Sequence, residues 1–205
     1  MTPILYSFRR CPYAMRARLA LAASDTEVEL REILLRDKPA AFLEVSQSAT
    51  VPCLVTQDGV IDESLDIMIW ALRRHDPDGW LTMPEAGFDL IREADGPFKQ
   101  ALDRSKYATR FPQDDPLAAR GRASDFMKTL DAQIGEWLFE GPSLADYAIL
   151  PFVRQFAFID KAWFDAQDWP ALQRWLDRFL DSERFAAIMV KYPTWEAGAS
   201  GVRFP

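Results

Sequence analysis

The chain has 205 residues, of which 49% are hydrophobic and 27% charged, and its formal net charge is −7. This composition is typical of an ordered globular protein and excludes a disordered one. The acidic balance argues against a nucleic-acid partner, because phosphate binding requires clustered lysine and arginine. No run of about eighteen apolar residues occurs, so neither a transmembrane helix nor a membrane partner is expected.

The first eighty residues alternate between strand and helix patterns. Residues 4–8 (ILYSF) predict a strand, and residues 12–23, which begin with a proline and are rich in alanine, leucine and arginine, predict a helix. The next predicted elements are a strand at 28–35, a short helix at 39–45, a hairpin of 53–56 and 60–61, and a helix from Glu63 to about Leu72. The predicted order is β-α-β-α-β-β-α.

The second half of the chain is predicted to be all helical. Turn-forming clusters at 77–87 predict a linker, and the long segments beyond it have apolar residues at helical spacing. We therefore predict an α/β domain at 1–76 and an all-α domain at 88–205, with a loosely held tail at 198–205.

The cysteine and histidine content bears on compartment and metal binding. Two cysteines cannot form a disulfide framework, and the N-terminus lacks the basic flank and apolar region of a secretory signal. A reducing, cytoplasmic setting is therefore expected. The single histidine, His75, has no second histidine or cysteine nearby, so we expect a surface or helix-end role and no metal.

Cys11, in the stretch RRCPYAMRAR, lies between the first strand and the first helix, where the pKa of a thiol is lowered. The positive end of a helix stabilises a thiolate, and Arg9, Arg10 and Arg16 can add to this effect. Ala14 stands where a redox pair would have its second cysteine, so no local disulfide can form. Cys11 can instead form a mixed disulfide with a small thiol, which a second thiol molecule releases. The alternative is a cysteine that only packs.

Two further elements have ligand-binding chemistry. Val51-Pro52 stands directly before a strand and suits a cis peptide bond, in a turn that presents the N–H and C=O of Val51 to a peptide-like ligand. An ordinary trans proline is the alternative. Glu63 and Ser64 begin a helix, so they suit the amino and carboxylate groups of an amino acid, although helix capping explains the pair equally well.

These elements, in this order, resemble the glutathione transferase superfamily. SFRRCPYAMRARLAL resembles the start of the cysteine-type members, especially the omega class and its bacterial relatives. LLRDKPAAFLEVSQSATVPCLVTQDGVIDES resembles their glutathione-binding edge, and GPSLADYAILPFVRQF resembles a buried helix with a Ser-x-x-Asp capping box at Ser143 and Asp146. The resemblance implies an α/β plus all-α fold: a thioredoxin-like N-terminal domain, a C-terminal α-helical bundle and an active site in the cleft between them.

The resemblance also implies a function and site residues. The chain would be a glutathione-dependent thiol transferase or reductase, with glutathione as co-substrate, and would form a homodimer. Cys11 would face the glutathione sulfur with Tyr13 beside it, and Lys38 would meet the glycyl carboxylate.

The remaining implied contacts lie at the other end of glutathione and in the second domain. Val51, followed by Pro52, would bind the cysteinyl backbone, and Glu63 with Ser64 would hold the γ-glutamyl end. A small hydrophobic or oxidised co-substrate would lie against the second domain, whose aromatic candidates are Phe98, Tyr107, Phe111 and Trp163.

Several alternatives stay open. Tyr6 or Ser7 could activate the glutathione thiol for conjugation to electrophiles, as hydroxyl groups do in other classes of the family. The chain could also be a non-catalytic protein-binding module, like the stringent starvation proteins. Cys53 is expected to be a buried structural thiol, with a redox partner of Cys11 as the alternative. SQSAT precedes Val51 where many members have a proline and a glycine.

Overall fold

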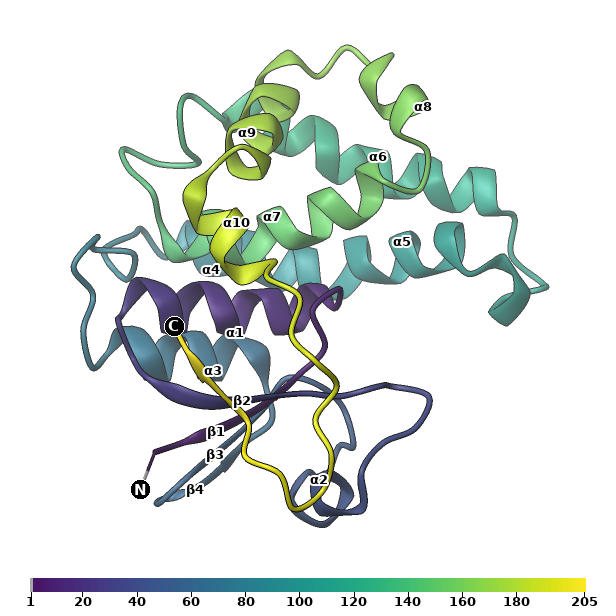
Figure 1. Cartoon of the computed structure of the whole chain (residues 1–205). Coiled ribbons are helices and arrows are strands. Elements are labelled where there is room, and N and C mark those ends of the chain that lie inside the picture. The colour runs from purple at the N-terminus through teal and green to yellow at the C-terminus, as the bar shows by residue number, and fades with distance from the viewer. Residues whose placement is uncertain (1) are drawn as a thin grey trace. The chain divides into compact units, whose positions relative to one another are not determined.

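Figure 1 shows the computed structural model of the protein, which describes residues 2–205. The chain forms two compact units. The first runs to Leu81 and also takes in Asp181–Pro205, and the second is Thr82–Leu180.

The first unit is built on a mixed five-stranded sheet. Its strands are β1 (Ile4–Ser7), β2 (Val28–Glu32), β3 (Cys53–Thr56), β4 (Gly59–Ile61) and β5 (Val202–Phe204), in the order β4-β3-β1-β2-β5. β1 pairs with β2 in parallel, and every other pair is antiparallel. This sheet confirms the predicted thioredoxin-like arrangement of the first seven elements.

Four helices accompany this sheet. They are α1 (Pro12–Ala23), α2 (Ala40–Val45), α3 (Ser64–Leu72) and α10 (Glu183–Ile188). α1 and α3 pack against each other on one side of the sheet, and α2 lies on the opposite side (Figure 1). α1 begins with Pro12 because the first turn of a helix needs no N–H from that residue, and nearly all of its side chains are buried.

The C-terminal segment differs from the prediction. Residues 181–205, predicted to lie in the all-α domain, group with the first unit because α10 packs on α1 and β5 pairs with β2. The prediction of a loosely held tail is wrong. Without β5, the outer edge of β2 would expose a row of unpaired N–H and C=O groups, and pairing with Val202–Phe204 satisfies them.

Gly201 is expected to be essential for this pairing. A Cβ atom at this position would lie 2.6 Å from the main-chain oxygen of Leu30, in the strand that β5 joins. Gly201→Ala should therefore lower the free energy of unfolding by about 2 kcal/mol, because one backbone must move away from the other. Urea denaturation measures this change.

Gly121 provides the matched control for that substitution. It lies inside a helix, and a Cβ atom there would meet nothing within 4 Å. Gly121→Ala should raise the free energy of unfolding by up to about 1 kcal/mol, because alanine favours the helix. Equal effects of the two substitutions would contradict the close approach of Gly201 to β2.

The second unit is all helical. Its α-helices are α4 (Ala86–Glu93), α5 (Lys99–Lys106), α6 (Pro116–Gln133), α7 (Leu144–Ala157), α8 (Lys161–Asp165) and α9 (Pro170–Leu180). The π-turn η1 (Ala94–Phe98) joins α4 to α5 and contains Pro97, whose missing N–H interrupts the regular ladder, and the 3₁₀ turn η2 (Ala108–Arg110) follows α5. No helix within residues 2–205 is both long and apolar enough to span a membrane.

Polar side chains cap the N-termini of several of these helices, including α6, α7 and α9. Asp115 accepts from the N–H of Leu117 at the start of α6, and one oxygen of Asp131 accepts from two N–H groups at the start of α9. At α7 the capping box predicted for Ser143 and Asp146 is confirmed. These caps satisfy N–H groups that the helices themselves leave free.

Candidate functional site

Cys11 is the residue immediately before α1, and its thiol lies against the main chain of Val51. The Cys11 Sγ donates to the Val51 carbonyl oxygen at 3.6 Å. The Cys11 carbonyl accepts from the N–H of Met15, which makes Cys11 the N-cap residue, and its side chain makes no capping hydrogen bond. The thiol therefore stands at the positive end of α1, as the sequence predicts.

The Val51-Pro52 peptide bond is cis, which decides between the two forms that the sequence left open. Val51 is 6% exposed, and its main-chain N–H donates to no acceptor among residues 2–205. Since buried N–H groups are nearly always paired, this donor next to Cys11 is a candidate contact for a ligand.

A single apolar cluster supports both Cys11 and Val51. Its buried members, which come from well-separated parts of the chain, are Tyr6, Ile33, Phe42, Val51, Cys53 and Trp195. Cys11 and Phe8 pack against this cluster from the side. Trp195, which no sequence pattern marked, belongs to the C-terminal segment, so that segment helps to build the floor of the candidate site.

Ser64 and Arg16 meet at the start of α3. The Arg16 Nη1 donates to the Ser64 Oγ at 3.4 Å, and both residues are buried. The Arg16 guanidinium also lies 5.6 Å from the centre of the Tyr13 ring. The sequence placed Arg16 near the Cys11 thiolate, and the structure places its guanidinium at the start of α3.

Two charged residues predicted at the site have no partner in the fold. Glu63 is the N-cap residue of α3, is exposed and makes no capping hydrogen bond through its side chain. Lys38 is half-buried just ahead of α2. Within residues 2–205 neither side chain forms a hydrogen bond or an ion pair with another residue. Both charges are therefore available to a ligand.

Arg9 and Arg10, which directly precede Cys11, have different partners. The Arg9 main-chain N–H donates to Glu32 at 2.6 Å, and its Nη1 donates to the Met189 carbonyl at 3.3 Å. Arg10 is exposed and stacks on the Phe8 ring at 5.4 Å. Arg9 therefore ties the segment before Cys11 to the C-terminal part of the chain.

Asp62 holds the loop that precedes Val51. Its carboxylate accepts from the Ser46 hydroxyl at 3.1 Å and from the Ser48 N–H at 3.3 Å. In the same loop Ala49 has a φ of +50°, a conformation that favours glycine. This role of Asp62 was not predicted from the sequence. The available signal was an acidic residue just before the start of a helix.

Cys53 is fully buried, as expected for a structural thiol. Burial, and then the hydrogen bond and negative charge of Asp62, raise the pKa of the Cys53 thiol to about 12. Both cysteines are free thiols. At neutral pH Cys53 is therefore protonated and inert.

The raised pKa of Cys53 predicts a loss of stability at alkaline pH. Between about pH 9 and pH 12 the folded protein keeps the thiol proton while the unfolded chain has lost it. Stability must then fall as pH rises, by about 1.4 kcal/mol per pH unit from this group. Urea denaturation of the wild type and Cys53→Ala at several pH values from 8 to 10.5 should show this extra slope only in the wild type. Parallel slopes would contradict the assignment.

The hydroxyl rivals of Cys11 are both buried. Tyr6 is 2% exposed, its hydroxyl accepts from Arg31 Nη1 at 2.8 Å, and its ring packs between Phe42 and Trp195. Ser7 is fully buried, and its hydroxyl has no partner within residues 2–205. Neither hydroxyl is open to a ligand as it stands.

In the second unit the predicted aromatic candidates separate into two kinds. Phe98 is 2% exposed and packs on the rings of Phe126 and Phe156, so it belongs to the core and not to a substrate surface. Tyr107 and Phe111 are half-buried, each beneath an arginine side chain. Trp163 is also half-buried. Contact of Trp163, Tyr107 and Phe111 with a co-substrate stays a prediction.

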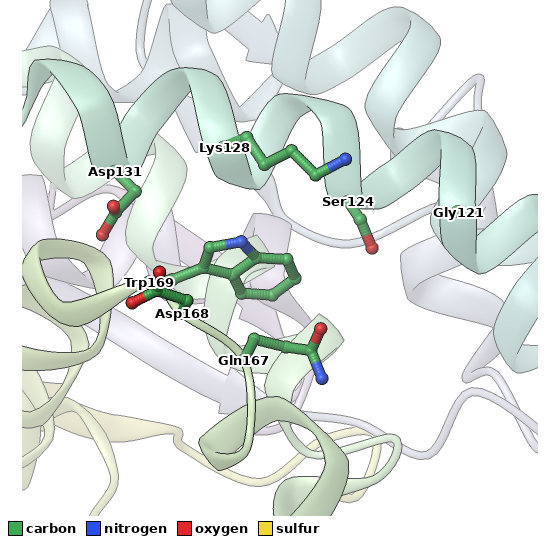
Figure 2. Close-up of a pocket in the computed structure, with 7 residues that line it drawn as sticks. All are labelled: Gly121, Ser124, Lys128, Asp131, Gln167, Asp168 and Trp169. Carbon is green, nitrogen blue, oxygen red and sulfur yellow. The ribbon is translucent and has the colours of Figure 1, made fainter.

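An open pocket of about 460 Å³ lies within the second unit, and Figure 2 shows the side chains that line it. It is lined by Gly121, Ser124, Lys128, Asp131, Gln167, Asp168 and Trp169. Ser124 donates to the Arg120 carbonyl, and the Asp131 carboxylate on α6 caps the start of α9, so these polar groups stabilise the helices. No residue predicted for the glutathione site lines this pocket.

Comparison with known proteins places the chain in a family. Residues 5–79 match the N-terminal domain of glutathione S-transferases, and residues 80–178 match the C-terminal domain. A probable glutathione transferase of Aplysia californica is 39% identical over 57 residues, which make up 28% of this chain and 62% of that protein. The alignment therefore spans less than two thirds of this relative.

Solved structures share the fold across both units. Glutathione transferase Omega 3C from Trametes versicolor has a TM-score of 0.77 at 17% identity, covering 94% of this chain and 91% of its own. A glutathione transferase family member from Pseudomonas fluorescens with two glutathione bound has a TM-score of 0.77 at 18% identity, covering 92% of each chain. A glutathione transferase from Pseudomonas putida with glutathione disulfide bound has a TM-score of 0.77 at 17% identity, covering 92% of this chain and 90% of its own.

The thioredoxin-like first domain, the all-helical second domain and the two matched domain families agree with one another. The chain therefore belongs to the glutathione transferase superfamily.

Proposed function

We propose that the protein is a glutathione-dependent thiol transferase in which the Cys11 thiolate is the nucleophile. The observation that carries this proposal is the contact between the Cys11 thiol and the main chain of Val51 at the N-terminus of α1. A thiol at a helix N-terminus is stabilised as the thiolate, and the neighbouring Val51 N–H is left for a peptide-like ligand.

Glutathione offers a complementary group to each of Val51, Lys38, Glu63 and Ser64. The Val51 N–H would bind the cysteinyl carbonyl of glutathione, and Lys38 would bind its glycyl carboxylate. Glu63 would bind the γ-glutamyl ammonium, and Ser64 at the start of α3 would bind the γ-glutamyl carboxylate. Tyr13, on the first turn of α1, would line the site beside the sulfur.

The proposed cycle is two thiol–disulfide exchanges. The Cys11 thiolate attacks the glutathione sulfur of a glutathionylated substrate, the substrate S–S bond breaks, and the substrate thiolate leaves and takes up a proton. A free glutathione thiolate then attacks the glutathione sulfur of the Cys11 mixed disulfide. Glutathione disulfide leaves and the Cys11 thiolate is restored, so each cycle converts one mixed disulfide and one free glutathione into one substrate thiol and one glutathione disulfide.

The burial of Tyr6 and Ser7 favours this cycle over conjugation through a hydroxyl. The Tyr6 hydroxyl already accepts a hydrogen bond from Arg31, and the Ser7 side chain is fully buried. The set of unpartnered groups at Val51, Lys38 and Glu63 favours an enzyme over a non-catalytic module, since a module has no need of a glutathione site.

Mass spectrometry after incubation with glutathione disulfide tests the proposal. The wild type and Cys53→Ser should each gain one glutathione on Cys11, which reduced glutathione removes, and Cys11→Ser should gain none. Thiol exchange by Cys11→Ala should fall about a thousandfold, while any conjugating activity survives. An adduct on Cys53, a link between the two cysteines or unchanged exchange would overturn the proposal.

The proposal includes a homodimer working in a reducing, cytoplasmic compartment. α3 and the two residues after it present a partly exposed patch of Asp66, Ile69, Trp70, Arg73 and Arg74, with Arg74 stacked on Trp70 at 4.0 Å. An isologous contact through this patch suits its mixture of apolar and charged groups. Light scattering on the purified protein, compared with Trp70→Glu, tests the assembly: a dimer should become a monomer.

A further inference from the structure

Arg16 is a buried cation at the base of the proposed glutathione site. It lies on α1 and is 1% exposed, and its Nη1 reaches the Ser64 Oγ at 3.4 Å across the contact between α1 and α3. Ser64 is itself only 4% exposed and is the first residue of α3, a helix of nine residues.

The chemistry of this pair fixes the direction of its hydrogen bond. A guanidinium group has five N–H donors and no acceptor, so the Ser64 oxygen must be the acceptor. The single hydroxyl hydrogen of Ser64 is then left for another acceptor. Within the described residues the Ser64 hydroxyl donates to no group.

We propose that Arg16 is a positioning residue for the γ-glutamyl carboxylate of glutathione, which it serves by orienting the Ser64 hydroxyl and placing a positive charge behind the start of α3. This inference rests on the proposed function, because it requires the γ-glutamyl end to bind at Glu63 and Ser64. The carboxylate then receives the Ser64 hydrogen and the N–H groups of α3, with the guanidinium charge close behind them.

Arg18, two residues further along α1, is a buried arginine with a structural role. It is fully buried, pairs with Glu32 and donates to the Ile188 carbonyl at 3.0 Å. Its contacts join α1 to β2 and to the C-terminal segment, and none of them reaches the start of α3. Arg18→Lys is therefore the matched control, a charge-conserving change at a buried arginine of the same helix.

Calorimetric titration with two ligands tests the inference. One ligand is glutathione, and the other is the analogue whose γ-glutamyl α-carboxylate is replaced by a carboxamide. Arg16→Gln should bind glutathione about tenfold more weakly than the wild type does. Its affinity for the carboxamide analogue should be within about twofold of the wild-type affinity for the same analogue. In thiol exchange the same variant should raise KM for glutathione and leave kcat unchanged.

Two further variants keep the test decisive. Arg16→Lys keeps the charge but not the planar donors, so it should bind glutathione only about threefold more weakly, again with the carboxamide unaffected. It decides the question if circular dichroism shows that Arg16→Gln is unfolded. Ser64→Ala should weaken glutathione binding about tenfold, and adding Arg16→Gln should weaken it by less than the tenfold that Arg16→Gln causes alone, because part of the Arg16 effect passes through Ser64.

The outcomes separate this inference from the proposed function. If the wild type does not bind glutathione, the proposed function fails. If the wild type binds but the Arg16 variants bind both ligands as well as it does, or lose both ligands equally, the positioning role of Arg16 is overturned. Arg18→Lys should leave the ratio of the two affinities unchanged.

Discussion

Asp146→Ala is expected to lower the free energy of unfolding by about 3–5 kcal/mol. The Asp146 side chain is fully buried and accepts four hydrogen bonds. Its donors are the N–H groups of Leu138 and Ser143, the Ser143 hydroxyl and the Trp175 indole N–H. Burial raises the pKa of Asp146, and the four donors act in the opposite direction. Alanine would leave all four donors without an acceptor in the core of the second unit.

Urea denaturation of three variants measures this effect. Ser143→Ala removes the cap but keeps the carboxylate, so it should lower the free energy of unfolding by about 1 kcal/mol. Asp125→Ala removes an exposed carboxylate of α6 that pairs with Lys128, and it should change stability by less than about 0.5 kcal/mol. A loss of about 1 kcal/mol or less for Asp146→Ala would show that the buried network is not needed.

Trp195→Ala is expected to lower the free energy of unfolding by about 3–4 kcal/mol. The Trp195 ring packs edge-on against Tyr6, with ring centres 5.8 Å apart, and the Arg31 guanidinium lies 4.4 Å above it. Its main-chain N–H donates to the Glu32 carbonyl at 2.7 Å, and its indole N–H donates to the Ala199 carbonyl at 2.8 Å. The loss of the ring would open a cavity within the apolar cluster that supports Cys11 and Val51.

This substitution should therefore affect the site as well as stability. We expect Trp195→Ala to weaken glutathione binding even where the protein is still folded, because Val51 and Cys11 pack on the same cluster. Trp195→Phe should restore most of both properties. Phe158→Ala, which truncates a ring that is 53% exposed, should change stability by less than about 1 kcal/mol and leave binding unchanged. Full glutathione affinity in folded Trp195→Ala would contradict the link between the C-terminal segment and the site.

The local features of this protein follow from its sequence. Helix α1 begins and ends where proline at its first turn and its run of alanine and leucine predict. The capping box at Ser143 and Asp146 also occurs where the sequence predicts it, and the bond before Pro52 takes the cis form, one of the two forms that the sequence left open. Each depends on neighbouring residues, whose main-chain preferences and spacing are visible without knowledge of the fold.

Only the tertiary structure decided which distant segments meet. β5 pairs with β2 although about 170 residues separate them, and a strand of three residues has too short a pattern to be recognised in a sequence. The same holds for Arg16, whose target at Ser64 depends on the packing of α1 against α3. Contacts between distant segments are selected by the shape and the unpaired groups of the folded surfaces, and the residue pattern within one segment does not record them.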